Sequence, residues 1–270
     1  MKDIYRFDLH THSDLSDGRS SLLEMLRAAE SYGMEGMAFS DHTFSDEEAE
    51  KLLAAYRSSA LPDSGVKLLY ATETAVADPS GKPAVSRELL RKFDLVLMDC
   101  NGILFRQMQG CSDKRELAGK LCEILSRACR APEVKIMAHP FNFGLAPLNV
   151  PLELFTDEMV GTVAGEFVKN RKIFEIMNQM YFWHTTTSFE HFHREYSRIV
   201  GIMKRAGVRF SLGSDTHSCC GIGNFLWSRR IVEEQGLTDR LFLPESMDGS
   251  HTGNRETGKP GKQEKERDRG

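Results

Sequence analysis

Short apolar runs alternate along this chain with longer segments in which apolar positions recur every three or four residues. Short runs bounded by turn residues are typical of buried strands, and the three-to-four periodicity predicts amphipathic helices. Seven strands are expected, over residues 4–10, 37–40, 66–71, 95–98, 134–138, 172–177 and 208–212.

Capping signals mark where helices begin between these strands. Ser21 and Ser45 are each followed three residues later by a glutamate, which is the capping-box pattern. Thr187 precedes a third such helix, which carries an apolar stripe up to Met203. Periodicity predicts further helices from residue 86, over 117–128 and over 156–168.

Repeated strand-then-helix units predict an α/β fold with a parallel sheet. Seven or eight such units within about 245 residues favour a closed barrel of the (β/α) type, with an open doubly wound sheet as the alternative. The chain contains neither a glycine-rich dinucleotide fingerprint nor a P-loop, so nothing supports a nucleotide cofactor.

Composition narrows the class of protein. The chain has a net charge of −4, whereas proteins that bind nucleic acid usually carry an excess of basic residues. Residues 245–270 hold six basic and six acidic residues with no aliphatic residue after Met247, so we expect residues 1–244 to form the folded domain and 245–270 a disordered polar tail. Without a signal-like or membrane-spanning run, and with six cysteines but no CxxC, the sequence favours a cytoplasmic protein.

Potential metal ligands stand at the ends of the expected strands. His10 and His12 follow the first strand, and Asp215 and His217 follow the last. Residues two apart in an extended strand point to the same face, so each pair would aim at one point. The C-terminal ends of the strands form the rim where (β/α) barrels build their active sites. Further ligands stand at the ends of the apolar runs between: Asp17, His42, Glu73 and His139.

A single histidine at a strand end is more often a structural hydrogen-bonding group than a metal ligand. Here five of the nine histidines lie at strand ends, and packing alone does not account for that pattern. Imidazoles and carboxylates are costly to bury without partners, and mixed nitrogen and oxygen donors suit clusters of divalent metals. A metal-dependent hydrolase is therefore the leading interpretation.

The candidate ligands fall in five short segments, in this order: Asp8-Leu9-His10-Thr11-His12 with Ser16-Asp17-Gly18, Phe39-Ser40-Asp41-His42, Glu73, Ala138-His139-Pro140 and Ser214-Asp215-Thr216-His217. Together they closely resemble the polymerase and histidinol phosphatase (PHP) family of metal-dependent phosphoesterases. The resemblance covers about residues 3–230. It implies a distorted (β/α)7 TIM-like barrel with a metal site at the C-terminal ends of the strands.

The resemblance also implies two to three divalent metals, which in this family are zinc, manganese or iron. His10, His12, Glu73 and Asp215 would hold the first metal. Glu73 would bridge to a second metal, which His139 would also hold.

Asp17, His42 and His217 would hold the third metal. A hydroxide generated on the metals would attack the phosphorus of a phosphate ester. His217 or a metal-bound water would protonate the leaving group, so His217 joins the four ligands of the first metal as an expected catalytic residue. Asp8 and Asp41 would either orient imidazoles or accept buried backbone hydrogen bonds.

One position departs from the family pattern. The family often has a histidine after the fourth strand, where this chain reads Asp99-Cys100-Asn101. Asn101 aligns with that histidine, and Asp99 points to the same face and could replace it. The second metal site is then weaker, selects manganese or iron, or is empty in the isolated protein.

Substrate-binding residues are expected in the loops at the same rim. Arg106, after the fourth strand, is the expected phosphate-binding arginine, with Arg19 and Arg171 as further candidates. Asn178 follows the sixth strand and is expected to contact substrate. Loop aromatics form a substrate wall, a cover of the barrel mouth or an oligomer interface: Phe141, Phe143, Tyr181, Phe182 and Trp183.

Three functions remain open. The length and the nearly complete ligand set favour a phosphomonoesterase of the histidinol phosphatase kind, acting on a small phosphorylated metabolite. A phosphodiesterase or nuclease is the second, and the negative charge argues against it. A metal-binding regulatory protein with degraded catalysis is the third, and Asn101 is its support. The sequence indicates no membrane partner and predicts neither the substrate nor the oligomeric state.

Overall fold

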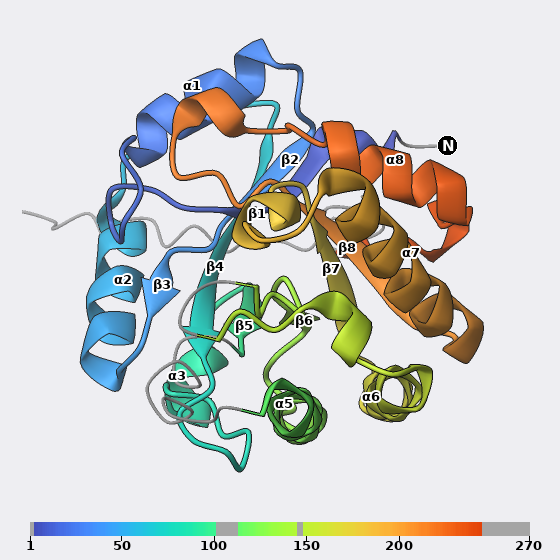
Figure 1. Ribbon diagram of the computed structural model, residues 1–270. Helices are drawn as coiled ribbons and strands as arrows, with labels where there is room; N and C mark the ends of the chain where they lie inside the picture. Colours follow the sequence, from blue (N-terminus) through green and yellow to red (C-terminus); the bar gives the residue numbers. More distant parts are fainter. Residues whose placement is uncertain (1–2, 101–112, 145–147, 245–270) are drawn as a thin grey trace, which may run out of the picture.

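Among the residues that the structure describes, eight parallel strands form the centre of the molecule and helices surround them (Figure 1). The computed structural model describes residues 3–100, 113–144 and 148–244. The expected tail, residues 245–270, lies outside the described residues, as do Asn101 and Arg106. The strands are β1 (Phe7–Thr11), β2 (Gly36–Phe39), β3 (His42–Thr43), β4 (Lys67–Ala75), β5 (Leu95–Asp99), β6 (Ile136–Met137), β7 (Ile173–Met177) and β8 (Arg209–Gly213).

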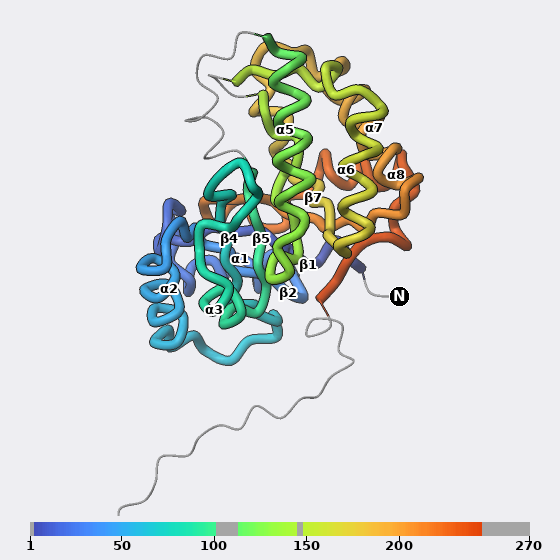
Figure 2. The backbone as a smooth tube through the Cα atoms, turned by 90° about the horizontal axis from the view of Figure 1, so that it is seen from below, coloured from blue at the N-terminus to red at the C-terminus, as the bar shows by residue number. Residues whose placement is uncertain are grey.

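Two helices begin at the expected caps, Ser21 and Ser45, whereas the helix from Phe189 is capped by Ser188, one residue after the expected Thr187. Ser21 accepts a hydrogen bond from the Glu24 N–H, and the Glu24 carboxylate accepts one from the Ser21 N–H, which completes a capping box. Within the described ranges, no helix has both the length and the apolar composition needed to cross a membrane. Three of the helices, α5 to α7, lie along one side of the barrel (Figure 2). The α-helices are α1 (Leu22–Ser31), α2 (Asp46–Ser58), α3 (Arg87–Leu90), α5 (Lys114–Ala128), α6 (Asp157–Lys169), α7 (Phe189–Ala206) and α8 (Leu226–Gln235).

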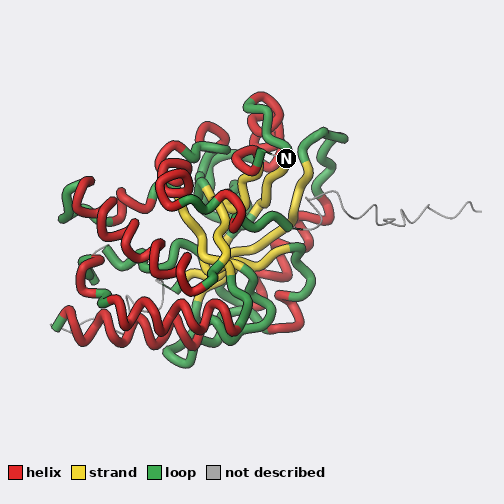
Figure 3. The backbone as a smooth tube through the Cα atoms, turned by 90° about the vertical axis from the view of Figure 1, so that its right-hand side faces the viewer, coloured by secondary structure: helices red, strands yellow, loops and turns green. Residues whose placement is uncertain are grey.

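The sheet closes on itself. The strands run in the order β1-β2-β4-β5-β6-β7-β8, and the short β3 pairs with β4. Beyond β8 the chain meets β1, where the His12 N–H donates to the Thr216 carbonyl at 2.9 Å and the Asp215 N–H donates to the His10 carbonyl at 2.9 Å. Figure 3 shows the strands gathered inside a layer of helices. The expected distorted (β/α)7 barrel is confirmed, and the open doubly wound sheet is wrong.

Apolar side chains fill both sides of the barrel wall. Leu97 and Ile173 belong to the interior cluster, whereas the next residues along the chain, Met98 and Phe174, pack between the strands and the helices. This alternation follows from the opposite directions of successive side chains in a strand. Strands buried on both faces read as unbroken apolar runs, and each of the seven predicted runs overlaps a strand. The first strand is shorter than predicted, because Ile4–Arg6 forms a 3-10 helix, and the fifth run contains only the two-residue strand Ile136–Met137.

The pairing between β1 and β2 changes register within the strand. Asp8 pairs with Met37 and Thr11 with Phe39, so β1 holds one residue more than β2 between these pairs. An extra residue on one strand is the arrangement of a β-bulge, which redirects side chains. His10 lies within this bulge, so its direction follows from the bulge and not from simple alternation.

Candidate metal centre

Four side chains meet at the C-terminal end of the barrel. The Nε2 atoms of His10 and His12 lie 3.0 Å apart. Glu73 Oε2 lies 3.1 Å from the first nitrogen and 3.4 Å from the second. Asp215 Oδ1 lies 3.5 Å and 3.1 Å from the same two atoms. Residues far apart along the chain thus direct four donor atoms at one point.

The spacing of these four atoms fits a divalent cation. A tetrahedral site with bonds of about 2.1 Å places its ligand atoms roughly 3.4 Å apart. The two imidazole nitrogens lie 3.0 Å apart, each carboxylate oxygen lies 3.1–3.5 Å from both of them, and the side chains are at most 7% exposed. Buried carboxylates and facing imidazole nitrogens need a positive charge between them. His10, His12, Glu73 and Asp215 could therefore hold one metal.

A second group forms around the other oxygen of Glu73. Glu73 Oε1 lies 3.0 Å from His139 Nε2, and His139 Nδ1 lies 3.6 Å from Asp99 Oδ1. The three residues form a group with metal-ligand spacing. His139 Nδ1 and Glu73 Oε1 are buried without a hydrogen bond of good geometry. Asp99, at the end of β5, thus lies where it could complete a second group of ligands.

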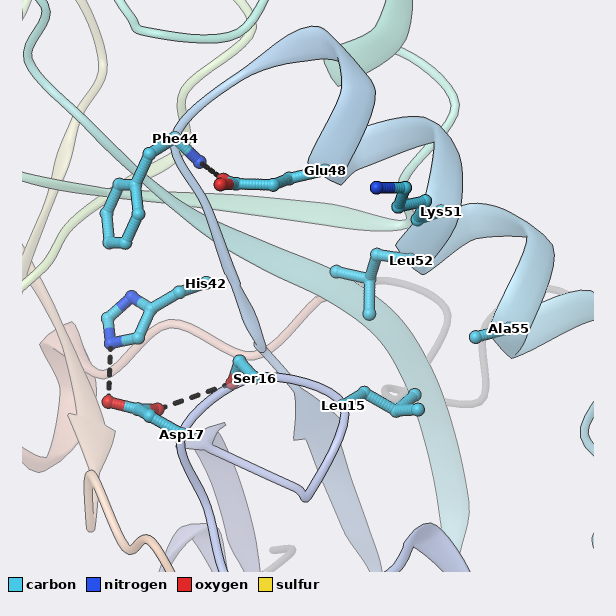
Figure 4. Close-up of a pocket in the computed structure, with 9 residues that line it drawn as sticks. All are labelled: Leu15, Ser16, Asp17, His42, Phe44, Glu48, Lys51, Leu52 and Ala55. Atoms are coloured by element: carbon cyan, nitrogen blue, oxygen red, sulfur yellow. Dashed lines mark hydrogen bonds and ion pairs between the residues drawn. The ribbon is translucent and has the colours of Figure 1, made fainter.

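A third group lies at the solvent edge. Asp17 Oδ2 lies 3.5 Å from His42 Nε2 (Figure 4). The same oxygen lies 3.2 Å from His217 Nε2. His12 completes this group of potential ligands. The hydrogen bond to His217 holds the pKa of Asp17 well below its usual range, and the same bond raises the pKa of His217 to about 9. Asp17 is 53% exposed and His217 38%, so this group faces an approaching ligand.

Glu175 supports the centre from beneath, and the sequence analysis missed it. Its Oε1 accepts from His10 Nδ1 at 2.7 Å, and its Oε2 accepts from the His139 N–H at 2.7 Å. A proton on Nδ1 leaves Nε2 of His10 free to bind a metal, which is the usual part of an outer carboxylate at such sites. The one available signal was a glutamate at the centre of the apolar run Ile173–Met177.

Burial and charge oppose each other within the cluster. Burial lowers the pKa of His10, but Glu175, Glu73 and Asp215 outweigh it, so this pKa lies well above its ordinary value. Burial also lowers the pKa of His139, but the close contact with the Glu73 carboxylate outweighs it and raises this pKa to about 10. Burial raises the pKa of Asp215, and the neighbouring imidazoles then bring it down to about 2. The carboxyl groups are therefore ionised at neutral pH, and a bound cation would balance their negative charge.

Backbone strain coincides with two of the ligands. Asp215 has a φ of 53° and His139 a φ of 29°, although neither is a glycine. Non-glycine residues in this region cost free energy and persist where the surrounding structure imposes them. Each follows directly on a strand at the barrel mouth, so the strain lies where the side chains must converge.

Gly213 makes room for the contact between Glu175 and His10. A Cβ at this position would lie 2.1 Å from Glu175 Oε1 and 2.6 Å from His10 Cβ. Gly213→Ala is expected to displace the carboxylate, to lower the free energy of unfolding by about 1–3 kcal/mol and to weaken metal binding about tenfold or more. Denaturant unfolding and metal titration measure the two effects.

Gly161 in α6 supplies the matched control. A Cβ there meets no atom within 4 Å. Gly161→Ala is expected to raise the free energy of unfolding by about 0.5–1 kcal/mol, because glycine is unfavourable inside a helix. Equal metal affinity in the two alanine variants would contradict the role given to Gly213.

Asp8 and Asp41, which the sequence predicts either to orient imidazoles or to accept backbone hydrogen bonds, accept hydrogen bonds from backbone N–H groups and hydroxyl groups. Asp8 accepts from the N–H groups of Ser214 and Gly223, which fastens the chain beyond β8 to β1. Asp41 accepts from the Ser13 N–H and hydroxyl and from the hydroxyls of Ser16 and Tyr56. Within the described part of the chain, neither carboxylate forms an ion pair with an imidazole, and both shape the loops that carry ligands.

Of the residues expected to bind substrate, one is engaged by α8, one lies near the outer ligands and one lies at the opposite end of the barrel. The side-chain oxygen of Asn178 accepts from the N–H groups of Trp227 and Ser228, so Asn178 positions α8. The Arg19 N–H donates to the His217 carbonyl at 2.8 Å, which places this residue near the third group. Arg171 immediately precedes β7 and therefore lies at the end of the barrel opposite the ligands.

Comparisons with known proteins identify the family and the fold of this chain. The PHP domain model matches residues 8–214. A probable phosphatase of Caldanaerobacter subterraneus is 26% identical over 251 residues, which cover 92% of this chain and 90% of the relative. A probable phosphatase of Acetivibrio thermocellus is 28% identical over 244 residues, covering 89% and 91%.

The fold has a counterpart among solved structures. The histidinol phosphate phosphatase of Lactococcus lactis, crystallised with zinc, L-histidinol and phosphate, superposes with a TM-score of 0.62 at 16% identity and covers 89% of this chain and 97% of that one. At this identity the likeness concerns the fold. Because the PHP model matches most of the sequence, this chain belongs to the PHP domain family.

Proposed function

We propose that this protein is a metal-dependent phosphatase that hydrolyses phosphomonoesters of small metabolites. The observation that carries the proposal is the pair of buried imidazoles of His10 and His12, 3.0 Å apart, with a carboxylate oxygen of Glu73 and one of Asp215 each 3.1–3.5 Å from both nitrogens. Probable phosphatases among the relatives, and a phosphatase with zinc and phosphate among the structures of the same fold, support it.

The three groups of ligands would hold two to three divalent ions. The four converging side chains would hold the first ion, and Glu73 would bridge to a second that also contacts His139 and Asp99. The outer group, Asp17, His42 and His217, would hold the third. Such ions supply a hydroxide at neutral pH and neutralise charge on the phosphoryl oxygens.

The protein's own residues would orient the ligands, exclude water and admit the substrate. Glu175 holds the Nδ1 proton of His10 and so keeps the other nitrogen available as a ligand. Burial excludes water from the inner ligands, which strengthens every charge interaction with a phosphoryl group. His217 has the most exposed imidazole of the ligand set, so a substrate approaches from its side.

Metal removal tests the proposal. Protein purified without chelator is expected to contain two to three ions of zinc, manganese or iron per chain by elemental analysis, and to hydrolyse simple phosphomonoesters. Dialysis against a chelator is expected to abolish hydrolysis, and added metal to restore it, because the nucleophile depends on the ions. Hydrolysis that survives complete metal removal would refute the proposal.

The same preparation distinguishes the other two functions. A nuclease would cleave an oligonucleotide and bind it with strong salt dependence, which the charge of −4 does not favour. A regulatory protein with degraded catalysis would bind metal without turnover. The position of Asp99 beside His139 weakens the support that Asn101 lent to that alternative.

A further inference from the structure

A groove opens directly beside the outer ligand group (Figure 4). It has a volume of about 490 Å3 and runs between the β1–α1 segment and one face of α2. Asp17 and His42 belong to its wall as well as to the ligand group. A phosphate ester bound by the ions therefore reaches this groove without crossing any other part of the molecule.

Four of the nine side chains that line the groove are apolar, and the others are Ser16, Asp17, His42, Glu48 and Lys51. Leu15 and Phe44 are 41% and 51% exposed, which is unusual for such large apolar residues in this chain, and both face the same space. Leu52 and Ala55 of α2 complete the apolar lining. Contiguous exposed apolar surface beside polar functional groups is typical of a ligand-binding site.

The charged residues of the groove already have partners. Glu48 Oε2 accepts from the Phe44 N–H at 2.6 Å, and Lys51 Nζ lies 2.6 Å from Glu47 Oε1. Neither charge needs an oppositely charged group on the ligand. The groove is thus suited to a group that offers apolar surface and few hydrogen bonds, unlike a sugar or a nucleotide.

Of the five aromatic residues that the sequence suggests as a wall, Phe182 is 71% exposed and Trp183 stacks on His139 with ring centroids 6.1 Å apart, whereas two others are buried. Phe141 and Phe143 are at most 1% exposed and pack within the core, so they cannot contact a substrate. Phe44, by contrast, stacks on the ligand His42, with ring centroids 5.1 Å apart. Apolar surface thus continues directly from a metal ligand into the groove.

We propose that this groove binds the alcohol part of the substrate, and that the substrates are phosphomonoesters of apolar alcohols. The inference rests on the proposed phosphatase function and adds the class of leaving group. The phosphoryl group would lie on the ions, and the apolar chain or ring would extend past Phe44 toward Leu52 and Ala55.

A series of straight-chain alkyl phosphates tests the groove on the metal-loaded protein. Methyl, butyl and hexyl phosphate have similar leaving groups but differ in apolar surface, and glycerol phosphate matches butyl phosphate in size but is polar. Because each buried methylene strengthens binding severalfold and the groove is partly open, kcat/KM is expected to rise about tenfold or more from methyl to hexyl phosphate. Glycerol phosphate is expected to fall below butyl phosphate.

A matched pair of variants on α2 assigns the effect to the groove. Ala55 lines it, whereas its neighbour Ala54 is exposed and does not. Ala55→Glu places a charge in the apolar space and is expected to lower the hexyl-to-methyl ratio of kcat/KM at least about fivefold. Ala54→Glu adds the same charge to the same helix and is expected to leave that ratio as in the wild type.

Binding of alkyl phosphonates gives a readout that does not require turnover. Hexylphosphonate is expected to bind the metal-loaded protein about tenfold or more tightly than methylphosphonate, by calorimetry, and Ala55→Glu to remove the difference. Equal affinities, or a chain-length dependence that Ala55→Glu leaves intact, would overturn the inference. If no ester were hydrolysed, the proposed function would be overturned instead. The phosphonate affinities would still show whether the groove binds an alkyl chain.

Discussion

Glu73→Gln is expected to lower kcat/KM for any phosphomonoester at least about a hundredfold and to remove at least one metal ion per chain. Both oxygens of Glu73 are engaged: Oε2 faces His10 and His12, and Oε1 faces His139. Glutamine has one oxygen and one NH2 group, so one of the two metal positions would face a donor that repels a cation. Loss of outer partners already costs ten- to a hundredfold, and a direct ligand matters more. Elemental analysis and steady-state kinetics measure both effects.

Glu133→Gln is the matched control for this experiment. Glu133 is a buried carboxylate of the same kind, with a side chain 3% exposed, but it pairs with Arg87 and Arg91, away from the ligands. Its substitution is expected to lower stability while metal content and kcat/KM stay near wild type. A full complement of metal in Glu73→Gln would refute the bridging role.

Glu175→Gln is expected to lower metal affinity and kcat/KM about ten- to a hundredfold while the protein remains folded. The carboxylate accepts from both His10 Nδ1 and the His139 N–H, whereas an amide has an acceptor for only one of them. The His10 ring would lose its fixed tautomer, and its Nε2 would no longer be held ready for a metal. Metal titration monitored by calorimetry, together with kinetics at saturating metal, separates weaker binding from slower turnover.

A double-mutant cycle shows whether Glu175 acts through His10. His10→Gln removes the imidazole, so adding Glu175→Gln to it is expected to cost little more in metal affinity. Additive losses in the double variant would mean that Glu175 works by another route, such as its bond to the His139 backbone. Far-ultraviolet circular dichroism checks that each variant retains its fold.

The positions of the strands and the ligands could be predicted because they depend on local pattern. Strands buried on both faces appear as apolar runs, and parallel strands in a barrel bring their C-terminal ends to one rim. His10 and Asp215 could thus be placed together without any knowledge of their distance. The same reasoning placed Asp99 on the face where the structure puts it, 3.6 Å from His139.

The features that the sequence did not predict depend on the exact strand register and on contacts between residues far apart in the chain. Glu175 lies within a strand and not at its end, and only its contact with His10 reveals its role. The bulge in β1 shifts the pairing by one residue, which no periodicity records. Asp41 was placed next to a ligand in sequence, yet its partners are Ser13, Ser16 and Tyr56, which the folded loops bring to it.

The seam between β1 and the chain beyond β8 has a consequence for biosynthesis. His12 and Asp215 lie at opposite ends of the domain's sequence, so the first ligand group does not exist until the last strand has been translated. A nascent chain that lacks β8 would also lack Asp215, so the proposed first metal site would be complete only after synthesis of the domain. Once bound, the ion would act as a cross-link around a loop of about two hundred residues, and cross-links that close long loops restrict the unfolded chain most. Metal supply in the cell would then govern how long the newly made protein survives, as well as whether it is active.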